Sequence, residues 1–284
     1  ALVFSFLACK AVSRRPLRRL GHRFGPIAFL SGRQSSNFSL SSLPLSEQNP
    51  GTQTNMWLTK MHSPPAERNK EPIWKILQEK VFSKEMRTDS EKWQILEVAG
   101  GAGVHTAHLV MRLADWNKKP FHWQSTDPEK DSRASQVAYM EEDITSSFQE
   151  YVSKTPLSLT LSSDGVVEPE TRSLVQSSSL DLIVNINMIH ISPWEATVGL
   201  MKLAKESLKV GGILYLYGPY KQNGTTAASN LKFDQFLQAK DSCFGIRNLE
   251  DVLALAKSEG LELVSITEMP ANNLSVILRL KEGV

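Results

Sequence analysis

Two acidic residues flank a glycine-rich turn in the first half of the chain. Glu97 ends an apolar stretch, Gly100, Gly101 and Gly103 follow it, and Asp127 comes 24 residues after Gly103. Glycines let the backbone of a turn approach a ligand closely. An acid at the end of the next strand can accept hydrogen bonds from the hydroxyls of a ribose. The types and spacing of these residues therefore predict a nucleotide-binding crevice.

The glycine turn matches the dinucleotide pattern G-x-G-x-x-G only in part. Gly101 and Gly103 supply the first two glycines, but Thr106 stands at the third, where glycine allows close packing of helix on strand. Glu97 would repel a diphosphate, whereas it can meet the ammonium group of S-adenosylmethionine directly or through water. The set favours S-adenosylmethionine over NAD. Asp127 serves either cofactor, and a plain strand–helix turn with a capping aspartate is the structural alternative.

Alternating strands and helices are expected to position these residues. The hydrophobic periodicity predicts helices at 63–82, 106–114, 130–154, 194–208 and 249–260, strands at 93–100, 121–128, 156–161, 180–189, 213–220, 261–268 and 273–280, a polar loop at 162–179, and a helix stop at 210–212. Such alternation predicts an α/β, Rossmann-like fold with a central, mostly parallel seven-stranded sheet. The last two strands are expected to pair as a C-terminal antiparallel hairpin, which is typical of class I methyltransferases.

The first 55 residues differ in composition from the rest. They hold seven of the 32 Lys and Arg residues and one of the 30 acids, Glu47. A basic, Ser-rich segment of this kind is typical of a mitochondrial transit peptide, and also of a disordered extension. We therefore divide the chain into a disordered or targeting tail at 1–55 and one domain at 56–284.

The remaining residues carry a small net negative charge. Residues 56–284 contain 25 basic and 29 acidic residues, so bulk charge argues against a nucleic-acid surface. No apolar run approaches the roughly 18 residues that a membrane span needs. The two cysteines, Cys9 and Cys243, offer no disulfide framework, which fits a reducing compartment. We expect an intracellular protein, cytoplasmic or imported into mitochondria.

Four longer stretches resemble one known family. They are SPPAERNKEPI at 63–73, NINMIHISPWEATVGL at 185–200, LYGPY with SNLKFD at 216–220 and 229–234, and EMPANN at 268–273. Together they resemble the methyltransferase-like protein 26 family, a branch of the class I S-adenosylmethionine-dependent methyltransferases, over about residues 61–280. The resemblance implies the fold and the cofactor. It leaves the methyl acceptor open, because the activity of that family is not settled.

The chain departs from the family pattern at two cofactor positions. Gly100 replaces a serine of the glycine turn, which is a harmless change. Thr160 replaces an aspartate that, by the resemblance, would receive the amino group of the adenine; a threonine hydroxyl can accept that bond, but more weakly. Asp164 is a possible substitute for the missing acid. Asp143 is a poorer one, because its spacing places it inside a helix.

The acceptor is expected outside the carboxyl end of the strand at 180–189. Asn187 lies there, in the place of the first residue of the Asn/Asp-Pro-Pro-Tyr motif of amine methyltransferases, although the rest of that motif is absent. His190 can act as a general base, contact the substrate, or be a buried histidine bonded to the backbone. Tyr220 can stack on an acceptor or serve packing alone. These three are the candidate catalytic residues.

Four further residues are candidate substrate contacts: Arg68 and Asn69 because the first helix of this fold can cover the cofactor, and Asn272 and Asn273 through the family resemblance. Arg68 and Asn69 lie on the first predicted helix, and Arg68 can bind a carboxylate or phosphate, or form a surface salt bridge. Asn272 and Asn273 lie in the turn of the C-terminal hairpin, where asparagine is common for conformational reasons. No cluster completes His105 and its neighbour His108 as metal ligands, so no metal site is expected.

The sequence therefore predicts an S-adenosylmethionine-dependent methyltransferase whose acceptor, a small molecule or a protein, is unknown. A first alternative is a non-catalytic protein that keeps the methyltransferase fold and acts through partners. A second is an NAD-dependent dehydrogenase, which would need a third glycine and a hydride-acceptor site, and the sequence shows neither.

Overall fold

A computed structural model describes residues 59–86, 88–116, 119–175 and 178–282. The prediction for the tail at 1–55 lies outside these ranges. Within them, no helix is both long and apolar enough to cross a membrane.

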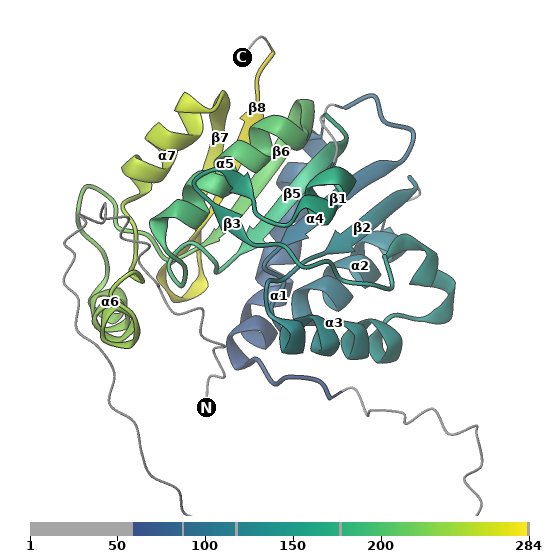
Figure 1. The fold of residues 1–284 in the computed structure, drawn as a ribbon, viewed down its shortest axis with the longest axis horizontal. Coiled ribbons are helices and arrows are strands. Elements are labelled where there is room, and N and C mark those ends of the chain that lie inside the picture. The colour runs from purple at the N-terminus through teal and green to yellow at the C-terminus, as the bar shows by residue number, and fades with distance from the viewer. Residues whose placement is uncertain (1–58, 87, 117–118, 176–177, 283–284) are drawn as a thin grey trace, which may run out of the picture. The chain divides into compact units, whose positions relative to one another are not determined.

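A six-stranded mixed sheet forms the centre of the domain (Figure 1). Its strands, in spatial order, are β2 (Phe121–Ser125), β1 (Trp93–Val98), β5 (Leu180–Ile186), β6 (Leu208–Gly218), β8 (Asn273–Leu280) and β7 (Leu261–Met269). The first four run parallel, and β8 pairs antiparallel with both β6 and β7. The predicted Rossmann-like methyltransferase fold, with its antiparallel C-terminal hairpin, is confirmed.

Helices cover both faces of the sheet. On one face lie α1 (Pro64–Ile76), the π-helix Leu77–Glu85, α2 (Val104–Trp116) and α3 (Lys130–Asp143), and on the other α5 (Trp194–Ser207) and α7 (Leu249–Ser258). Alternate residues of a strand point to opposite faces. Tyr215 and Tyr217 of β6 accordingly pack with the first set, while Leu214 and Leu216 pack with the second. Burial on both faces explains the nearly continuous apolar runs of β5 and β6.

The seventh strand of the prediction does not form. The segment at 156–161 runs beside β2, but a single isolated bridge, between Thr126 and Leu157, takes the place of a strand ladder there. It then turns into a separate two-stranded hairpin of β3 (Leu161–Ser162) and β4 (Gly165–Val166). This hairpin packs against α5 so closely that a Cβ on Gly199 would lie 2.3 Å from the carbonyl oxygen of Ser162. Packing of the hairpin, and not strand propensity, decides the course of the segment.

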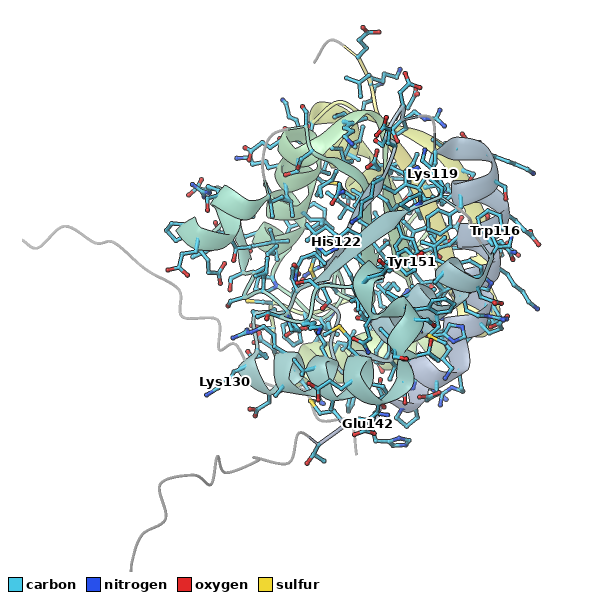
Figure 2. The ribbon with its side chains drawn as sticks, turned by 90° about the vertical axis from the view of Figure 1, so that its right-hand side faces the viewer. Trp116, Lys119, His122, Lys130, Glu142 and Tyr151 are labelled. Carbon is cyan, nitrogen blue, oxygen red and sulfur yellow. The ribbon has the colours of Figure 1, made fainter. Side chains whose placement is uncertain are left out.

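Two predicted elements near the β2 edge are also wrong. The helix expected at 130–154 ends at Asp143, and a 3₁₀ helix, Ser146–Tyr151, follows after a break. The break lets the ring of Tyr151, labelled in the view from this edge (Figure 2), stack on Phe121 of β2 with the ring centroids 4.7 Å apart. The loop expected at 162–179 contains β3, β4 and the short helix α4 (Pro169–Leu174).

Two further differences concern the C-terminal half. The expected helix stop at 210–212 lies inside β6, which begins at Leu208 and is irregular where it pairs with β5. Helix α6 (Ala228–Lys240) was not predicted from its periodicity. Its buried side chains, Asn230, Asp234 and Leu237, are mostly polar, so the helix lacks the apolar stripe on which such predictions depend.

Candidate functional site

The glycine turn follows β1 and has the backbone geometry that its glycines allow. Gly101 and Gly103 have φ of 56° and 98°, in the region that favours glycine. A Cβ on Gly103 would lie 2.7 Å from the Cα of Gln136, so this glycine lets α3 pack directly on the turn. A Cβ on Gly101 would meet no atom within 4 Å. The turn therefore packs directly against α3 at Gly103, whereas at Gly101 no part of the described chain covers it.

Glu97 is buried beneath this turn, with 1% of its surface exposed. The Thr106 hydroxyl and the Trp123 indole N–H both donate to its Oε2, at 2.6 Å and 2.9 Å. Its Oε1 is buried without a hydrogen-bond partner among the described residues. Burial raises the pKa of Glu97 to about 7, even though the two donors favour the charged form. The unpartnered oxygen can still accept a bond from a donor at the turn.

Asp127 joins the end of β2 to the same turn. Its Oδ2 accepts a hydrogen bond from the N–H of Gly101 at 2.9 Å, and its Oδ1 accepts one from the N–H of Glu129, also at 2.9 Å. Burial raises its pKa, while the two backbone bonds act in the opposite direction. Each carboxylate oxygen has a further lone pair, so the group can still accept a bond from a ribose hydroxyl.

These features fit the cofactor that the family resemblance implies. The unpartnered Glu97 Oε1 suits an ammonium donor, the space above Gly101 admits a ligand, and Asp127 lies at the carboxyl end of β2. In open α/β sheets, ligands bind outside the carboxyl ends of the strands. The cofactor assignments of Glu97, Gly100, Gly101, Gly103 and Asp127 stay predictions.

A second polar group lies at the carboxyl end of β6, and we call it the Tyr217 cluster. It consists of Tyr217, Asn69, Asn273 and His105. The side chains of Asn69 and Asn273 lie beside the Tyr217 hydroxyl and act to lower its pKa, against the effect of burial, and the imidazole Nε2 of His105 lies 2.7 Å from Asn69 Oδ1. Burial lowers the pKa of His105 to about 3. The cluster is uncharged, and it ties α1 and α2 to the ends of β6 and β8.

The sequence indicated only half of this cluster. Asn69 and Asn273 were expected as substrate contacts, but Tyr217 and His105 were not. A signal for Tyr217 was available: in LYLYGPY, the alternation of side chains along a strand puts Tyr217 on the same face as Tyr215 and Tyr220 on the opposite face. The sequence indicates His105 only as one half of an incomplete metal-ligand pair with His108.

Asn187 lies next to the Tyr217 cluster. It follows β5 with φ of 60°, a left-handed conformation that asparagine tolerates, and its N–H donates to the carbonyl oxygen of Tyr217 at 2.8 Å. Its side-chain Oδ1 would lie 3.7 Å from a Cβ on Gly218. The structure thus places Asn187 directly after the carboxyl end of β5, where an acceptor was expected, and its role there stays a prediction.

His190 is buried behind Gly218, whose Cβ position lies 3.4 Å from His190 Nδ1. Its ring packs edge-on against Phe233 of α6 at 5.6 Å, and its carbonyl oxygen accepts the N–H of Gly245 at 3.0 Å. Burial lowers its pKa to about 3, and the charge of Arg247 adds to the effect. A base with so low a pKa drives proton abstraction poorly, which weighs against the predicted general-base role.

Three other expected site residues lie apart from the Tyr217 cluster. Tyr220 is buried in the core on the opposite face of the sheet. Asn272 has φ of 57° and donates to the Ser229 hydroxyl of α6 at 2.9 Å, which matches the turn role weighed for it. Arg68 is exposed on α1, and no ion pair joins it to a described residue. Their functional roles stay predictions.

Thr160 contacts a carboxylate that the sequence did not indicate. Its N–H and hydroxyl donate to Glu168, at 2.8 Å and 2.7 Å. Neither acid weighed from the sequence lies here: Asp143 is the last residue of α3 and pairs with Lys60, and Asp164 is exposed in the β3–β4 turn. Glu168 lies eight positions after Thr160, and it reaches Thr160 only because the chain folds back in the β3–β4 hairpin.

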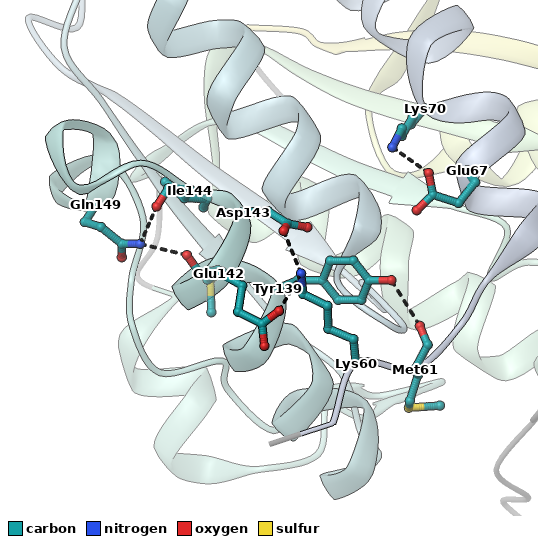
Figure 3. Close-up of polar contacts among 10 residues, drawn as sticks. Lys60, Met61, Glu67, Lys70, Tyr139, Glu142, Asp143, Ile144 and Gln149 are labelled. Carbon is teal, nitrogen blue, oxygen red and sulfur yellow. Dashed lines mark hydrogen bonds and ion pairs between the residues drawn. The ribbon is translucent and has the colours of Figure 1, made fainter. Parts of the chain in front are cut away.

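The chain before α1 is fastened to α3 beside the glycine turn (Figure 3). Lys60 pairs with Glu142 and Asp143 at 2.9 Å and 2.6 Å, and the Tyr139 hydroxyl donates to the carbonyl oxygen of Met61 at 3.3 Å. The Ser135 hydroxyl bridges the Met61 N–H and the carbonyl oxygen of Ala102. These contacts set where α1, and hence Asn69, enters the site.

The described residues contain no group of three or more His, Cys, Asp or Glu side chains placed to hold a metal ion. Burial lowers the pKa of His108, and its imidazole lies 3.1 Å from the Glu71 carboxylate, which also binds Arg112. The contact with Glu71 shows that His108 links α2 to α1.

Solved structures share this fold at low sequence identity. An O-methyltransferase family protein from Burkholderia thailandensis superposes with a TM-score of 0.58 and 13% identity, over 77% of this chain and 59% of its own. A putative sarcosine dimethylglycine methyltransferase from Galdieria sulphuraria gives 0.53 and 12%, over 79% and 93%. CalO1, a methyltransferase of calicheamicin biosynthesis solved with S-adenosylhomocysteine, gives 0.52 and 13%, over 75% and 54%. This chain thus spans little more than half the length of the first and third of these proteins.

The neighbours establish the fold, and a family model establishes the relationship by sequence. The model matches residues 60–280, which include every described element of the site. The chain therefore belongs to the family described as "Protein of unknown function (DUF938)".

Proposed function

We propose that this protein is an S-adenosylmethionine-dependent methyltransferase and a member of the methyltransferase-like protein 26 family. The observation that carries the proposal is the buried Glu97, whose free oxygen lies beneath an open glycine turn that Asp127 joins to β2. Structural likeness to methyltransferases, one of them solved with S-adenosylhomocysteine, supports the same cofactor. When bound, S-adenosylmethionine supplies the electrophilic methyl group.

The chain's own residues would then bind and orient the two reactants. Glu97 accepts a bond from the ammonium group, and Asp127 accepts bonds from the ribose. The uncharged Tyr217 cluster and Asn187 hold the acceptor at the carboxyl ends of β5 and β6. Positioning of reactants alone can contribute a large part of the rate of a displacement reaction. The buried, neutral His190 supports the loop after β5 in this scheme and does not take a proton.

The acceptor is a small molecule or a protein, and a turnover experiment tests whether there is one. The full chain is incubated with S-adenosylmethionine and a cell extract separated into small-molecule and protein fractions, and the S-adenosylhomocysteine formed is measured. We expect product that depends on one fraction and is lost in Asp127→Asn. Cofactor binding with no product in any fraction would favour the alternative, a non-catalytic protein that keeps the methyltransferase fold and acts through partners.

A further inference from the structure

Thr160 and Glu168 form a hydrogen-bonded pair just beyond the β2 edge of the sheet. The Thr160 hydroxyl donates to Glu168 Oε1 at 2.7 Å, and the Thr160 N–H donates to Oε2 at 2.8 Å. The Ser158 hydroxyl approaches Oε1 at 3.4 Å. Thr160 and Glu168 are both only partly buried, so a ligand can reach the pair.

The pair lies beyond the carboxyl end of β2, the end of the sheet at which Asp127 also lies. The N–H of Leu157 donates to the carbonyl oxygen of Ser125, and the N–H of Asp127 donates to the carbonyl oxygen of Leu157, both at 3.1 Å. The segment therefore runs parallel to β2 and continues past its carboxyl end. Thr160 follows Leu157 by three residues, which span at most about 10 Å. A nucleoside whose ribose is bound at Asp127 has its base within reach of this segment.

The pair offers hydrogen-bond acceptors and no donor. A hydroxyl has a single proton, and that of Thr160 points to the carboxylate, so only its lone pairs face outward. Partial burial raises the pKa of Glu168, but the bonds from Thr160 outweigh this effect and the pKa is lowered overall. The carboxylate is therefore ionised at neutral pH and accepts only. Such a pair binds an amino group and rejects a carbonyl oxygen.

We infer that Thr160 and Glu168 together recognise the exocyclic amino group of the adenine of the bound cofactor. The inference rests on the proposed function, and it assigns to two residues the place of the aspartate that the family resemblance puts at position 160. Glu168 supplies the negative charge, and Thr160 transmits it through a polarised hydroxyl. The pair thereby selects adenine over hypoxanthine, in which a carbonyl oxygen replaces the amino group.

Calorimetric titration of the full chain with S-adenosylhomocysteine and with S-inosylhomocysteine tests this inference. The wild-type chain is expected to bind the adenosyl compound about tenfold more tightly, the effect of one good hydrogen bond. Thr160→Val removes the acceptor and should reduce this ratio to about twofold. Glu168→Gln places an amide donor against Thr160, turns the hydroxyl proton outward, and should bring the ratio to about one or below.

Two matched variants serve as controls. Thr160→Ser keeps the hydroxyl, and Glu170→Gln removes a charge from an exposed residue of α4; both should retain the wild-type ratio. An unchanged ratio in folded Thr160→Val and Glu168→Gln would overturn the inference while leaving the proposed function intact. If Glu168→Gln does not fold, the ratio for Thr160→Val decides. Failure of the wild-type chain to bind either compound would instead overturn the proposed function.

Discussion

The hydroxyl of Thr106 donates to the carboxylate of Glu97 at 2.6 Å, across the turn where a dinucleotide fold has its third glycine. Thr106 and Glu97 are both buried. A glycine at 106 could not make this bond, and the Glu97 carboxylate would lose one of its two donors. Thr106, which stands where the dinucleotide pattern has its third glycine, thus holds in place Glu97, the acid whose charge disfavours a dinucleotide.

Burial of Glu97 makes the stability of the protein depend on pH. Its pKa is about 7 in the folded chain against 4.5 when exposed, so the folded state retains a proton that the unfolded state loses. The free energy of unfolding should therefore fall as the pH rises from 4.5 to 7, by roughly 3 kcal/mol, and level off above that range.

Glu97→Gln imitates the protonated acid and isolates this effect. Asp127 also has a raised pKa and acts with the same sign, so the informative quantity is the difference between the wild-type chain and the variant. In urea denaturation at pH 5, 6, 7 and 8, the free energy of unfolding of the variant should increase relative to that of the wild-type chain up to neutral pH. A constant difference would mean that Glu97 is ionised throughout.

Cofactor binding should release protons near neutral pH. An ammonium group beside Glu97 favours its charged form and lowers its pKa, so binding at pH 6.5 should expel a large part of one proton. Calorimetry with S-adenosylmethionine in buffers of different ionisation enthalpy measures this release. Binding of equal enthalpy in all the buffers would place the ammonium group elsewhere, and Glu97→Gln should abolish the release.

Gly103 and Gly101 provide a matched pair for the geometry of the turn. Gly103→Ala should destabilise the protein by about 3 kcal/mol, because its Cβ would meet the Cα of Gln136 at 2.7 Å and φ is 98°. Gly101→Ala has the positive φ without the clash and should cost about 1 kcal/mol. Denaturation of the two variants gives the comparison, and equal costs would contradict the contact between α3 and the turn.

His190 and His105 should stay neutral from pH 5 to 8, because burial lowers both pKa values to about 3. Nuclear magnetic resonance of the imidazole ring protons measures this directly. Their signals should not shift over that range, whereas histidines of the unfolded chain titrate near pH 6.5. Titration of His190 near 6.5 would restore it as a general base.

The sequence was informative where a single periodicity or motif decides the structure. The apolar runs, the glycine turn and the two flanking acids predicted β1, β5, the first crossover and the C-terminal hairpin, because local pattern and tertiary contact agree there. The prediction of a strand at 156–161, beyond β2, was wrong, because packing of the β3–β4 hairpin against Gly199 outweighs the strand propensity of this segment. Helix α6 was missed because its buried positions are polar.

The site was predictable to a similar extent. Asn273 was indicated by the family resemblance and Asn69 by its place on the first helix, whereas their shared neighbour, Tyr217, follows only from the alternation of β6 and from the entry of α1 beside it. Glu168 could not be predicted, because the fold of a hairpin brings it to Thr160 and no periodicity does so. Contacts between elements distant in the chain account for Tyr217 and His105, and the local hairpin accounts for Glu168.

The most direct measurement is calorimetric titration of the full chain with S-adenosylmethionine, with NAD and the Asp127→Asn variant as controls. The structure predicts that S-adenosylmethionine binds, that NAD does not, and that the variant loses about tenfold or more in affinity through the lost charge-assisted bonds to the ribose. Binding of NAD in preference, or of neither ligand, would contradict the assignment of the crevice at Glu97, Gly101 and Asp127.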